Sequence, residues 1–206
     1  MPLRSPDTFD SAVVVPLRSF RVGKARLASR LEPAERAALA REMAERVIDA
    51  AQGIPTVVVS SDPDVISWTE LRGVECLADP GTLDAAACAG RSWARERAIT
   101  RVAVVHADLP LVTSLDRVVS PGADPVVLAV PCHRGDGTPV LSIPSAVNFR
   151  FSYGPGSFGR HCAEAERLGL PLRVVRDPSL SFDIDLPEDL DQLARRTRLP
   201  ATSPGA

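Results

Sequence analysis

Short apolar runs alternate with amphipathic stretches along this chain, and most of the runs are rich in β-branched residues. A continuous apolar run of about four to eight residues is typical of a strand that is buried on both faces of a sheet. The pattern predicts strands over residues 12–17, 55–60, 74–78, 101–106, 125–130, 140–143 and 172–176. It predicts helices over residues 33–51, 82–97, 157–168 and 187–196.

Strands that alternate with helices form a mostly parallel sheet with helices on both faces. The pattern therefore predicts a three-layer αβα domain of the Rossmann-like kind. We expect one domain over residues 1–199 and a flexible tail over 200–206, where Pro, Ser, Gly and Ala dominate. Ligands of such sheets bind beyond the carboxyl ends of the strands, so the candidate chemistry should lie in the segments that follow them.

Composition excludes several classes of partner. The net charge is −2 and aromatic residues make up 4% of the 206 residues, which argues against a nucleic-acid partner. No segment reaches the roughly 20 apolar residues of a membrane span. The first apolar run stops at Pro16 and is too short for the core of a signal peptide. We therefore expect a cytoplasmic protein with no membrane partner.

A cationic loop follows the first predicted strand. It contains Arg18, Arg21, Lys24 and Arg26, and Lys24 is the only lysine of the chain. Cationic side chains and backbone N–H groups between a strand and a helix can bind a triphosphate. The loop matches neither common glycine-rich phosphate motif, so a plain solvated basic loop is the alternative.

Three aspartates lie in segments that follow predicted strands. Asp108 follows the central strand at 101–106, where Mg²⁺ could pair it or where it could cap a helix. Asp183 and Asp185 point to the same side of an extended segment, and two such carboxylates repel unless a cation lies between them. An Asx turn with a helix cap is the alternative for this pair.

Glu188 and Asp189 follow Pro187 and fit the first turn of a helix.

Two turns contain candidate anion-binding groups. Gly154, Gly156 and Ser157 precede a predicted helix, and Thr138 ends a Gly-Asp-Gly-Thr turn. Backbone N–H groups and a hydroxyl at a helix start suit an anion, although both turns are also common as plain turns. Together, the cationic loop, the aspartates and these turns fit a Mg²⁺-dependent nucleotidyl transfer to a phosphorylated acceptor.

Five motifs occur in a fixed order. They are Val-Pro-Leu-Arg with Gly-Lys-Ala-Arg-Leu, His-Ala-Asp-Leu-Pro, Asp-Gly-Thr, Tyr-Gly-Pro-Gly-Ser-Phe with a later His, and Phe-Asp-Ile-Asp-Leu-Pro-Glu-Asp-Leu. This order resembles the CofC/FbiD guanylyltransferases of coenzyme F420 biosynthesis from about Val13 to Leu193. The resemblance implies a MobA-like nucleotidyltransferase fold, GTP as donor and phosphoenolpyruvate as acceptor. The alternative acceptors are 2-phospho-L-lactate and 3-phosphoglycerate, and the product would pass to a downstream F420-pathway transferase.

The resemblance also implies roles for individual residues. The residues that match Mg²⁺ ligands, with two ions expected, are Asp108, Asp183 and Asp185. The residues that match binders of the phospho-acid are Thr138, Gly154 and Ser157. The residues that match the basic loop at the GTP phosphates are Arg18, Lys24 and Arg26.

Three positions depart from the family pattern. Arg18 replaces the usual Lys, Pro139 replaces the usual Asn after Gly-Thr, and Asp84 replaces the usual Asn near the expected nucleotide side. Pro139 lacks a backbone donor and a side-chain amide beside Thr138, so this departure bears on the identity of the acceptor more than on the class of reaction. A different MobA-like nucleotidyltransferase and a non-catalytic GTP-binding module are the remaining alternatives.

Overall fold

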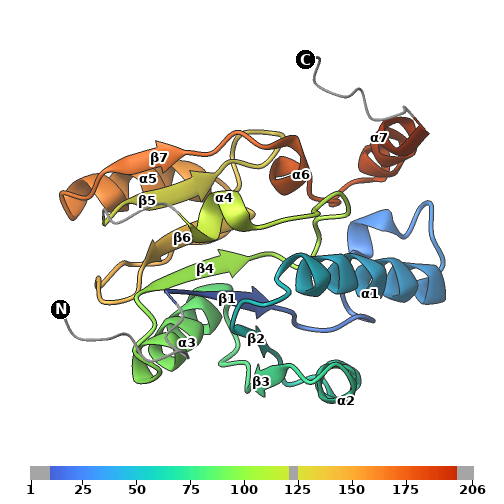
Figure 1. Cartoon of the computed structure of the whole chain (residues 1–206). Helices are drawn as coiled ribbons and strands as arrows, with labels where there is room; N and C mark the ends of the chain where they lie inside the picture. The colour runs from blue at the N-terminus through green and yellow to red at the C-terminus, as the bar shows by residue number, and fades with distance from the viewer. Residues whose placement is uncertain (1–9, 121–124, 199–206) are drawn as a thin grey trace, which may run out of the picture.

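The computed structural model describes residues 10–120 and 125–198, and its seven strands form one sheet (Figure 1). The strands are β1 (Ser11–Pro16), β2 (Thr56–Val59), β3 (Glu75–Leu77), β4 (Arg101–Val105), β5 (Val127–Val130), β6 (Val140–Pro144) and β7 (Leu172–Val174). The helices are α1 (Pro33–Ala50), α2 (Pro63–Leu71), α3 (Leu83–Glu96), α4 (Asp116–Val119), α5 (Ser157–Arg167), α6 (Pro178–Ser181) and α7 (Pro187–Arg198), with a 3₁₀ turn at Ala25–Leu27. The predicted tail at 200–206 lies outside the described residues.

The strand order is β3-β2-β1-β4-β6-β5-β7. The pairs of β1 with β2 and β4, of β2 with β3, and of β5 with β7 are parallel, whereas β6 is antiparallel to both β4 and β5. The carboxyl ends of the parallel strands therefore share one edge of the sheet with the amino end of β6. This reversal brings Thr138 and Pro139, just before β6, to the edge where the segment after β4 begins.

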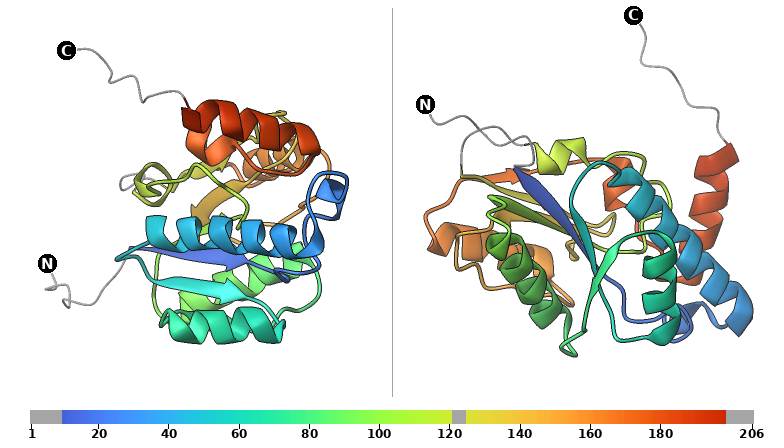
Figure 2. Two further views of the ribbon diagram at one scale, coloured as in Figure 1. Left: turned by 90° about the vertical axis from the view of Figure 1, so that its right-hand side faces the viewer. Right: turned by 60° about the horizontal axis from the view of Figure 1, so that its bottom comes forward.

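Helices cover both faces of the sheet because the strand residues alternate between two cores. Val13 and Val15 of β1 pack in a cluster with α1 and α2, whereas Ala12 and Val14 pack on the other face with α3 and α5. The right-hand view of Figure 2 separates α3 and α5 on one side from α1 and α2 on the other. The Cβ of any residue replacing Gly90 of α3 would lie 2.3 Å from a Val14 methyl group, so this helix packs directly on the sheet.

The predicted three-layer architecture is confirmed, and every predicted strand and helix within the described residues is present within about two residues at each end. Three short helices were not predicted. The sequence of helix α2 contains two signals that could have predicted it, an N-cap residue at Asp62 and a proline in the first turn at Pro63. In the structure, the Asp62 side chain accepts hydrogen bonds from the Asp64 and Val65 N–H groups. Helices α4 and α6 have four residues each and leave no periodic pattern.

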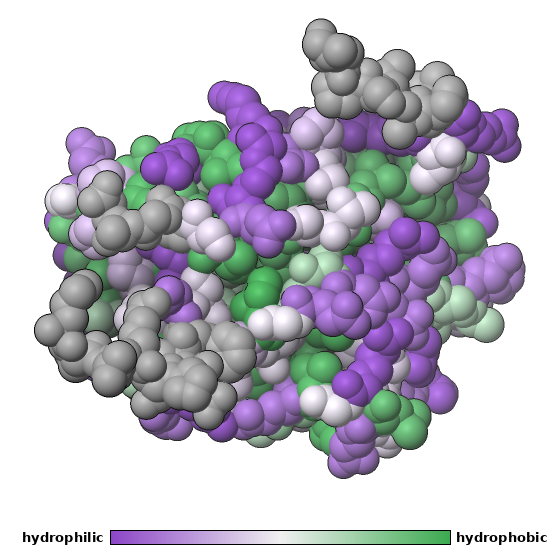
Figure 3. Space-filling model, viewed as in Figure 1, coloured by the Kyte–Doolittle hydropathy of each residue, from purple (hydrophilic) through white to green (hydrophobic). Residues whose placement is uncertain are grey.

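Hydrophilic and hydrophobic side chains are interspersed on the face that Figure 3 shows. Among the described residues, the exposed large hydrophobic side chains are Val22, Leu71 and Val174. Within residues 10–120 and 125–198, each helix is too short or too polar to cross a membrane.

Candidate active site

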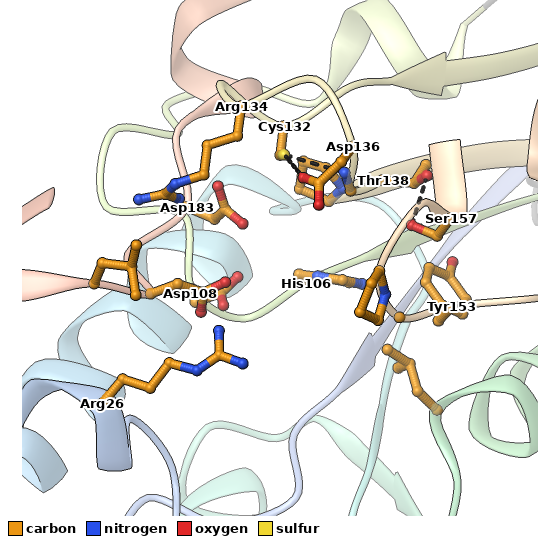
Figure 4. Close-up of a pocket in the computed structure, with 17 residues that line it drawn as sticks. Arg26, His106, Asp108, Cys132, Arg134, Asp136, Thr138, Tyr153, Ser157 and Asp183 are labelled. Carbon is orange, nitrogen blue, oxygen red and sulfur yellow. Dashed lines mark hydrogen bonds between the residues drawn. The ribbon is translucent and has the colours of Figure 1, made fainter. Parts of the chain in front are cut away.

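A cavity of about 410 Å³ opens at the carboxyl edge of the sheet. Its walls come from the segments after β4 and β5, the turn before β6, the start of α5 and the segment before α7. Figure 4 shows charged side chains at one end, among them Arg26, Asp108 and Asp183, and the hydroxyl groups of Thr138 and Ser157 at the other. The cavity therefore joins the predicted charged residues to the predicted anion turns.

Lys24 binds the carboxylates of the charged end. Its backbone is left-handed, with φ +61°, and it caps the 3₁₀ turn. Its Nζ lies 2.7 Å from Asp108 Oδ2 and 3.2 Å from Asp185 Oδ1, and it also donates to the Ile184 carbonyl. Burial alone would lower the pKa of Lys24, but the two carboxylates outweigh burial and raise it. The ammonium group is therefore charged and neutralises part of the negative charge at this end of the cavity.

Asp108 keeps one oxygen free for a further cation or donor. Its Oδ1 is buried and has no hydrogen-bond partner among the described residues. Burial alone would raise the pKa of Asp108, but Lys24 and then His106 outweigh it and lower the pKa, so the side chain is ionised. A buried carboxylate oxygen without a partner is costly, and a ligand that binds here would remove that cost.

Asp183 lies at the same end but has a different partner. Its Oδ1 lies 3.0 Å from His133 Nδ1, and its side chain is 12% exposed. Burial and the carboxylates of Asp108 and Asp185 raise the pKa of Asp183. Ile184 between the two aspartates is fully buried, as their shared orientation predicts.

The three aspartates fit a cation site by charge, although Lys24 already binds Asp108 and Asp185. Asp183 instead lies against His133. Within the described residues, no three His, Cys, Asp or Glu side chains are grouped closely enough to hold a metal ion. The mutual repulsion that raises the pKa of Asp183 and the unpartnered Oδ1 of Asp108 both favour a cation between these carboxylates. Magnesium binding stays a prediction.

The cations of the loop separate into different environments. Arg26 lines the cavity near Asp108, whereas the Arg18 side chain is 75% exposed and donates to the Gly81 carbonyl at 2.9 Å. Arg18 also lines two adjoining hollows of about 200 and 250 Å³. Arg21 points away and pairs with Asp64. The loop thus directs Lys24 and Arg26 inward and leaves Arg18 at a neighbouring opening.

The hydroxyl end is built by the turn before β6 and the start of α5. Thr138 and Ser157 are 1% and 2% exposed, and their hydroxyl oxygens are 3.2 Å apart. Gly154 and Gly156 have φ values of +96° and +73°, which favour glycine, and the Ser157 N–H donates to the Gly154 carbonyl. The structure therefore brings the predicted Thr138, Gly154 and Ser157 together.

Two of the three residues that depart from the family pattern, Asp84 and Pro139, have structural partners at the hydroxyl end of the cavity. Asp84 Oδ1 accepts a hydrogen bond from the Tyr153 N–H at 2.7 Å, so it supports the segment that leads to Gly154. An Asn oxygen could accept the same bond. Pro139 lines the cavity, and its carbonyl accepts from the His106 N–H. Asp84 thus supports the hydroxyl end of the cavity through its contact with Tyr153.

Several cavity residues were not predicted from the sequence. Arg134, Asp136, Cys132, His106 and Tyr153 all line the cavity. His106, Asp136 and Tyr153 begin motifs that the resemblance already uses, and that signal could have selected them. Cys132 and Arg134 only follow a predicted strand.

Asp189 does more than the predicted first-turn acid. It lies in the first turn of α7, as predicted, is fully buried, and accepts from the Asp185 and Leu186 N–H groups at 2.8 Å each. It also binds the Arg134 guanidinium and lies 3.2 Å from His133 Nε2. Burial alone would raise the pKa of Asp189, but the hydrogen bond from Arg134 and those from the amides outweigh it and lower the pKa. Asp189 therefore fixes the backbone on which Asp185 lies.

Comparison with known proteins gives the fold and the family. The chain is 35% identical over 92% of its length to a phosphoenolpyruvate guanylyltransferase of Sphaerobacter thermophilus, of which it covers 95%. It is 29% identical over 89% of its length to a 2-phospho-L-lactate guanylyltransferase of Methanothermobacter thermautotrophicus, of which it covers 83%. A crystal structure of a nucleotide-diphospho-sugar transferase from Desulfovibrio desulfuricans superposes with a TM-score of 0.76 at 14% identity, over 94% of this chain and 90% of that one. Residues 11–196 match the family described as guanylyl transferase CofC like, and the chain belongs to that family.

Proposed function

We propose that this protein transfers GMP from GTP to phosphoenolpyruvate and releases diphosphate. The observation that carries the proposal is a single cavity with charged groups at one end and a hydroxyl and glycine turn at the other. A relative that is 35% identical carries the same activity in its name, which supports this acceptor. The relative named for 2-phospho-L-lactate supports the alternative acceptor.

The proposed reaction is an in-line attack of an acceptor phosphate oxygen on the α-phosphorus of GTP. The P–O bond to the β-phosphate breaks as the new P–O bond forms, and diphosphate leaves with its electron pair. The acceptor oxygen is already anionic, so the reaction needs no general base. The barrier therefore comes mainly from charge repulsion and from positioning.

The charged end would bind the triphosphate. Asp108, Asp183 and Asp185 would hold two Mg²⁺ ions, which when bound neutralise the phosphates and the developing charge on diphosphate. Arg26 lies at the same end and would add a cation for the phosphates. Arg18, at the adjoining hollows, would contact the nucleotide farther from the reacting atoms. Lys24 neutralises Asp108 and Asp185, and its ammonium group would contact a phosphate by a short movement.

The hydroxyl end would bind the phospho-acid. Thr138, from the turn before β6, and Gly154 and Ser157, from the turn at the start of α5, would offer hydroxyl and backbone donors to an anion. Hand-over of the product to a downstream F420-pathway transferase is part of this proposal, since a mixed diphosphate product is expected to be labile.

Pyrophosphate release tests the proposal. GTP and Mg²⁺ would be supplied with phosphoenolpyruvate, 2-phospho-L-lactate or 3-phosphoglycerate in separate reactions, with ATP as the donor control and EDTA as the metal control. We expect release that depends on GTP, on metal and on phosphoenolpyruvate. A signal with another acid alone would change the acceptor. GTP binding without release from any acid would favour a different acceptor or a non-catalytic module.

A further inference from the structure

The hydroxyl pair of Thr138 and Ser157 has a third, fully buried partner behind it. His161 of α5 is 0% exposed, and its Nδ1 lies 3.0 Å from Thr138 Oγ1. The hydroxyl oxygens of Thr138 and Ser157 are 3.2 Å apart and both residues line the cavity. The three side chains therefore form a chain of hydrogen bonds that ends at the cavity wall.

The backbone determines which ring nitrogen of His161 carries the proton. The Ser152 N–H donates to Nε2 at 3.1 Å. A backbone N–H can only donate, so Nε2 must be the unprotonated nitrogen. The neutral ring therefore carries its hydrogen on Nδ1 and donates it to Thr138.

The surroundings keep this ring neutral and in place. Burial lowers the pKa of His161 to about 4, so the ring is uncharged near neutral pH. Tyr153 contacts it edge-on at 4.8 Å between ring centroids, and Phe149 lies 5.9 Å away. The two nitrogens thus face two fixed partners, Ser152 and Thr138.

This arrangement leaves one hydroxyl hydrogen of the pair without a partner among the three side chains. The Nδ1–H, the Thr138 hydroxyl and the Ser157 hydroxyl supply three hydrogens, and the two contacts between them use two. One hydroxyl hydrogen remains, whichever of Thr138 and Ser157 donates to the other. The opposite tautomer would draw the Thr138 hydrogen to the ring and the Ser157 hydrogen to Thr138, so the pair would present only lone pairs.

We infer that His161 is a positioning residue whose fixed tautomer leaves one hydroxyl hydrogen of the Thr138–Ser157 pair free to bind an anionic oxygen of the acceptor. This inference rests on the proposed function, because that function puts the phospho-acid at this end. A carboxylate or phosphate oxygen accepts hydrogen bonds and cannot donate when ionised, so it needs a donor here. His161 itself does not reach the acceptor and acts through Thr138.

The matched variants His161→Gln and His161→Glu test the direction in which hydrogen bonds are donated from His161 through Thr138 to Ser157. The Gln amide can accept from Ser152 and donate to Thr138, as His161 does, whereas an ionised Glu of the same shape can only accept. We expect His161→Gln to keep the phosphoenolpyruvate KM within about threefold of wild type. In His161→Glu we expect that KM to rise at least about tenfold at high pH, the loss typical of one hydrogen bond to a charged group.

The pH dependence of the phosphoenolpyruvate KM distinguishes a reversed hydrogen-bond direction from a general disturbance of the fold. A protonated Glu can donate to Thr138, so the phosphoenolpyruvate KM of His161→Glu should rise with pH as its carboxyl ionises, while that of His161→Gln stays flat. The GTP KM should stay within about twofold of wild type in both variants. Equal acceptor KM values for Gln and Glu at every pH would overturn the inference.

Nitrogen-15 NMR of the wild-type protein tests the tautomer without using activity. The chain has three histidines, and the signals of His161 are those lost in His161→Gln. We expect hydrogen on Nδ1 at neutral pH, and hydrogen on Nε2 would overturn the inference even if a variant failed to fold. Inactivity of the wild-type protein with every acid would overturn the proposed function, whereas this spectrum would still decide the tautomer.

Discussion

The Nζ of Lys24 lies 2.7 Å from Oδ2 of Asp108, although 84 residues separate the two in the chain. The contact joins the loop after β1 to the segment after β4, two neighbouring strands of the sheet. The side chains are 11% and 22% exposed, so water screens this pair only weakly. Lys24 therefore neutralises carboxylates that a bound cation would also neutralise.

Lys24→Met should destabilise the metal-free protein. Removing one partner of a largely buried pair leaves the other charge uncompensated, at a cost of about 2 kcal/mol after allowing for the exposure of Asp108. Added Mg²⁺ should raise the melting temperature of this variant more than that of wild type, because the cation takes over the neutralisation. Thermal unfolding with and without Mg²⁺ measures both effects.

Arg21→Met is the matched control in the same loop. The Arg21 side chain is 76% exposed, and its surface pair with Asp64 should contribute little. Equal melting temperatures for Lys24→Met and Arg21→Met in metal-free buffer would contradict the role given to Lys24.

Asp183→Asn should lower kcat by roughly 10²-fold or more, about 2.7 kcal/mol of barrier, because the predicted metal site loses a charged ligand. Pyrophosphate release under saturating substrates measures the loss. Asp191→Asn is the control, since Asp191 pairs with Arg30 on the surface. A loss under about fivefold in Asp183→Asn would return this residue to a structural role in its turn.

Ser157→Ala should raise the KM for the phospho-acid by up to about tenfold, because the acceptor loses one hydroxyl of the pair. The KM for GTP should change little, since Ser157 lies at the opposite end of the cavity from Asp108 and Arg26. Steady-state kinetics with each substrate varied in turn decides the point. A larger effect on the GTP KM would move Ser157 to the nucleotide side.

His161 should make the folded state less stable at acid pH. Its pKa is lowered to about 4 in the folded protein from an ordinary 6.5, so between these values the unfolded chain binds more protons. The stabilisation is complete above pH 6.5 and falls as the pH drops to 4, by about 3 kcal/mol in total. Denaturant unfolding at several pH values should show a steeper decline for wild type than for His161→Gln. Parallel pH curves would show that the folded ring titrates normally.

The sequence alone was enough to predict the order of strands and helices, because each buried strand is a continuous β-branched run and each long helix has an apolar face. It also predicted that Asp108, Asp183, Thr138 and Ser157 would approach one another, because ligands of open sheets lie at the carboxyl edge. These features depend on local patterns and on one general rule of topology.

The tertiary structure alone determined the pairing of side chains across that edge. The reversal of β6, the contact of Lys24 with Asp108, and the binding of Asp189 by Arg134 connect residues far apart in the chain. No periodicity in the sequence encodes such contacts, since they depend on strand order and on how loops close over the sheet. The tautomer of His161 also cannot be predicted from a sequence pattern, because it depends on where the packed fold places the Ser152 N–H.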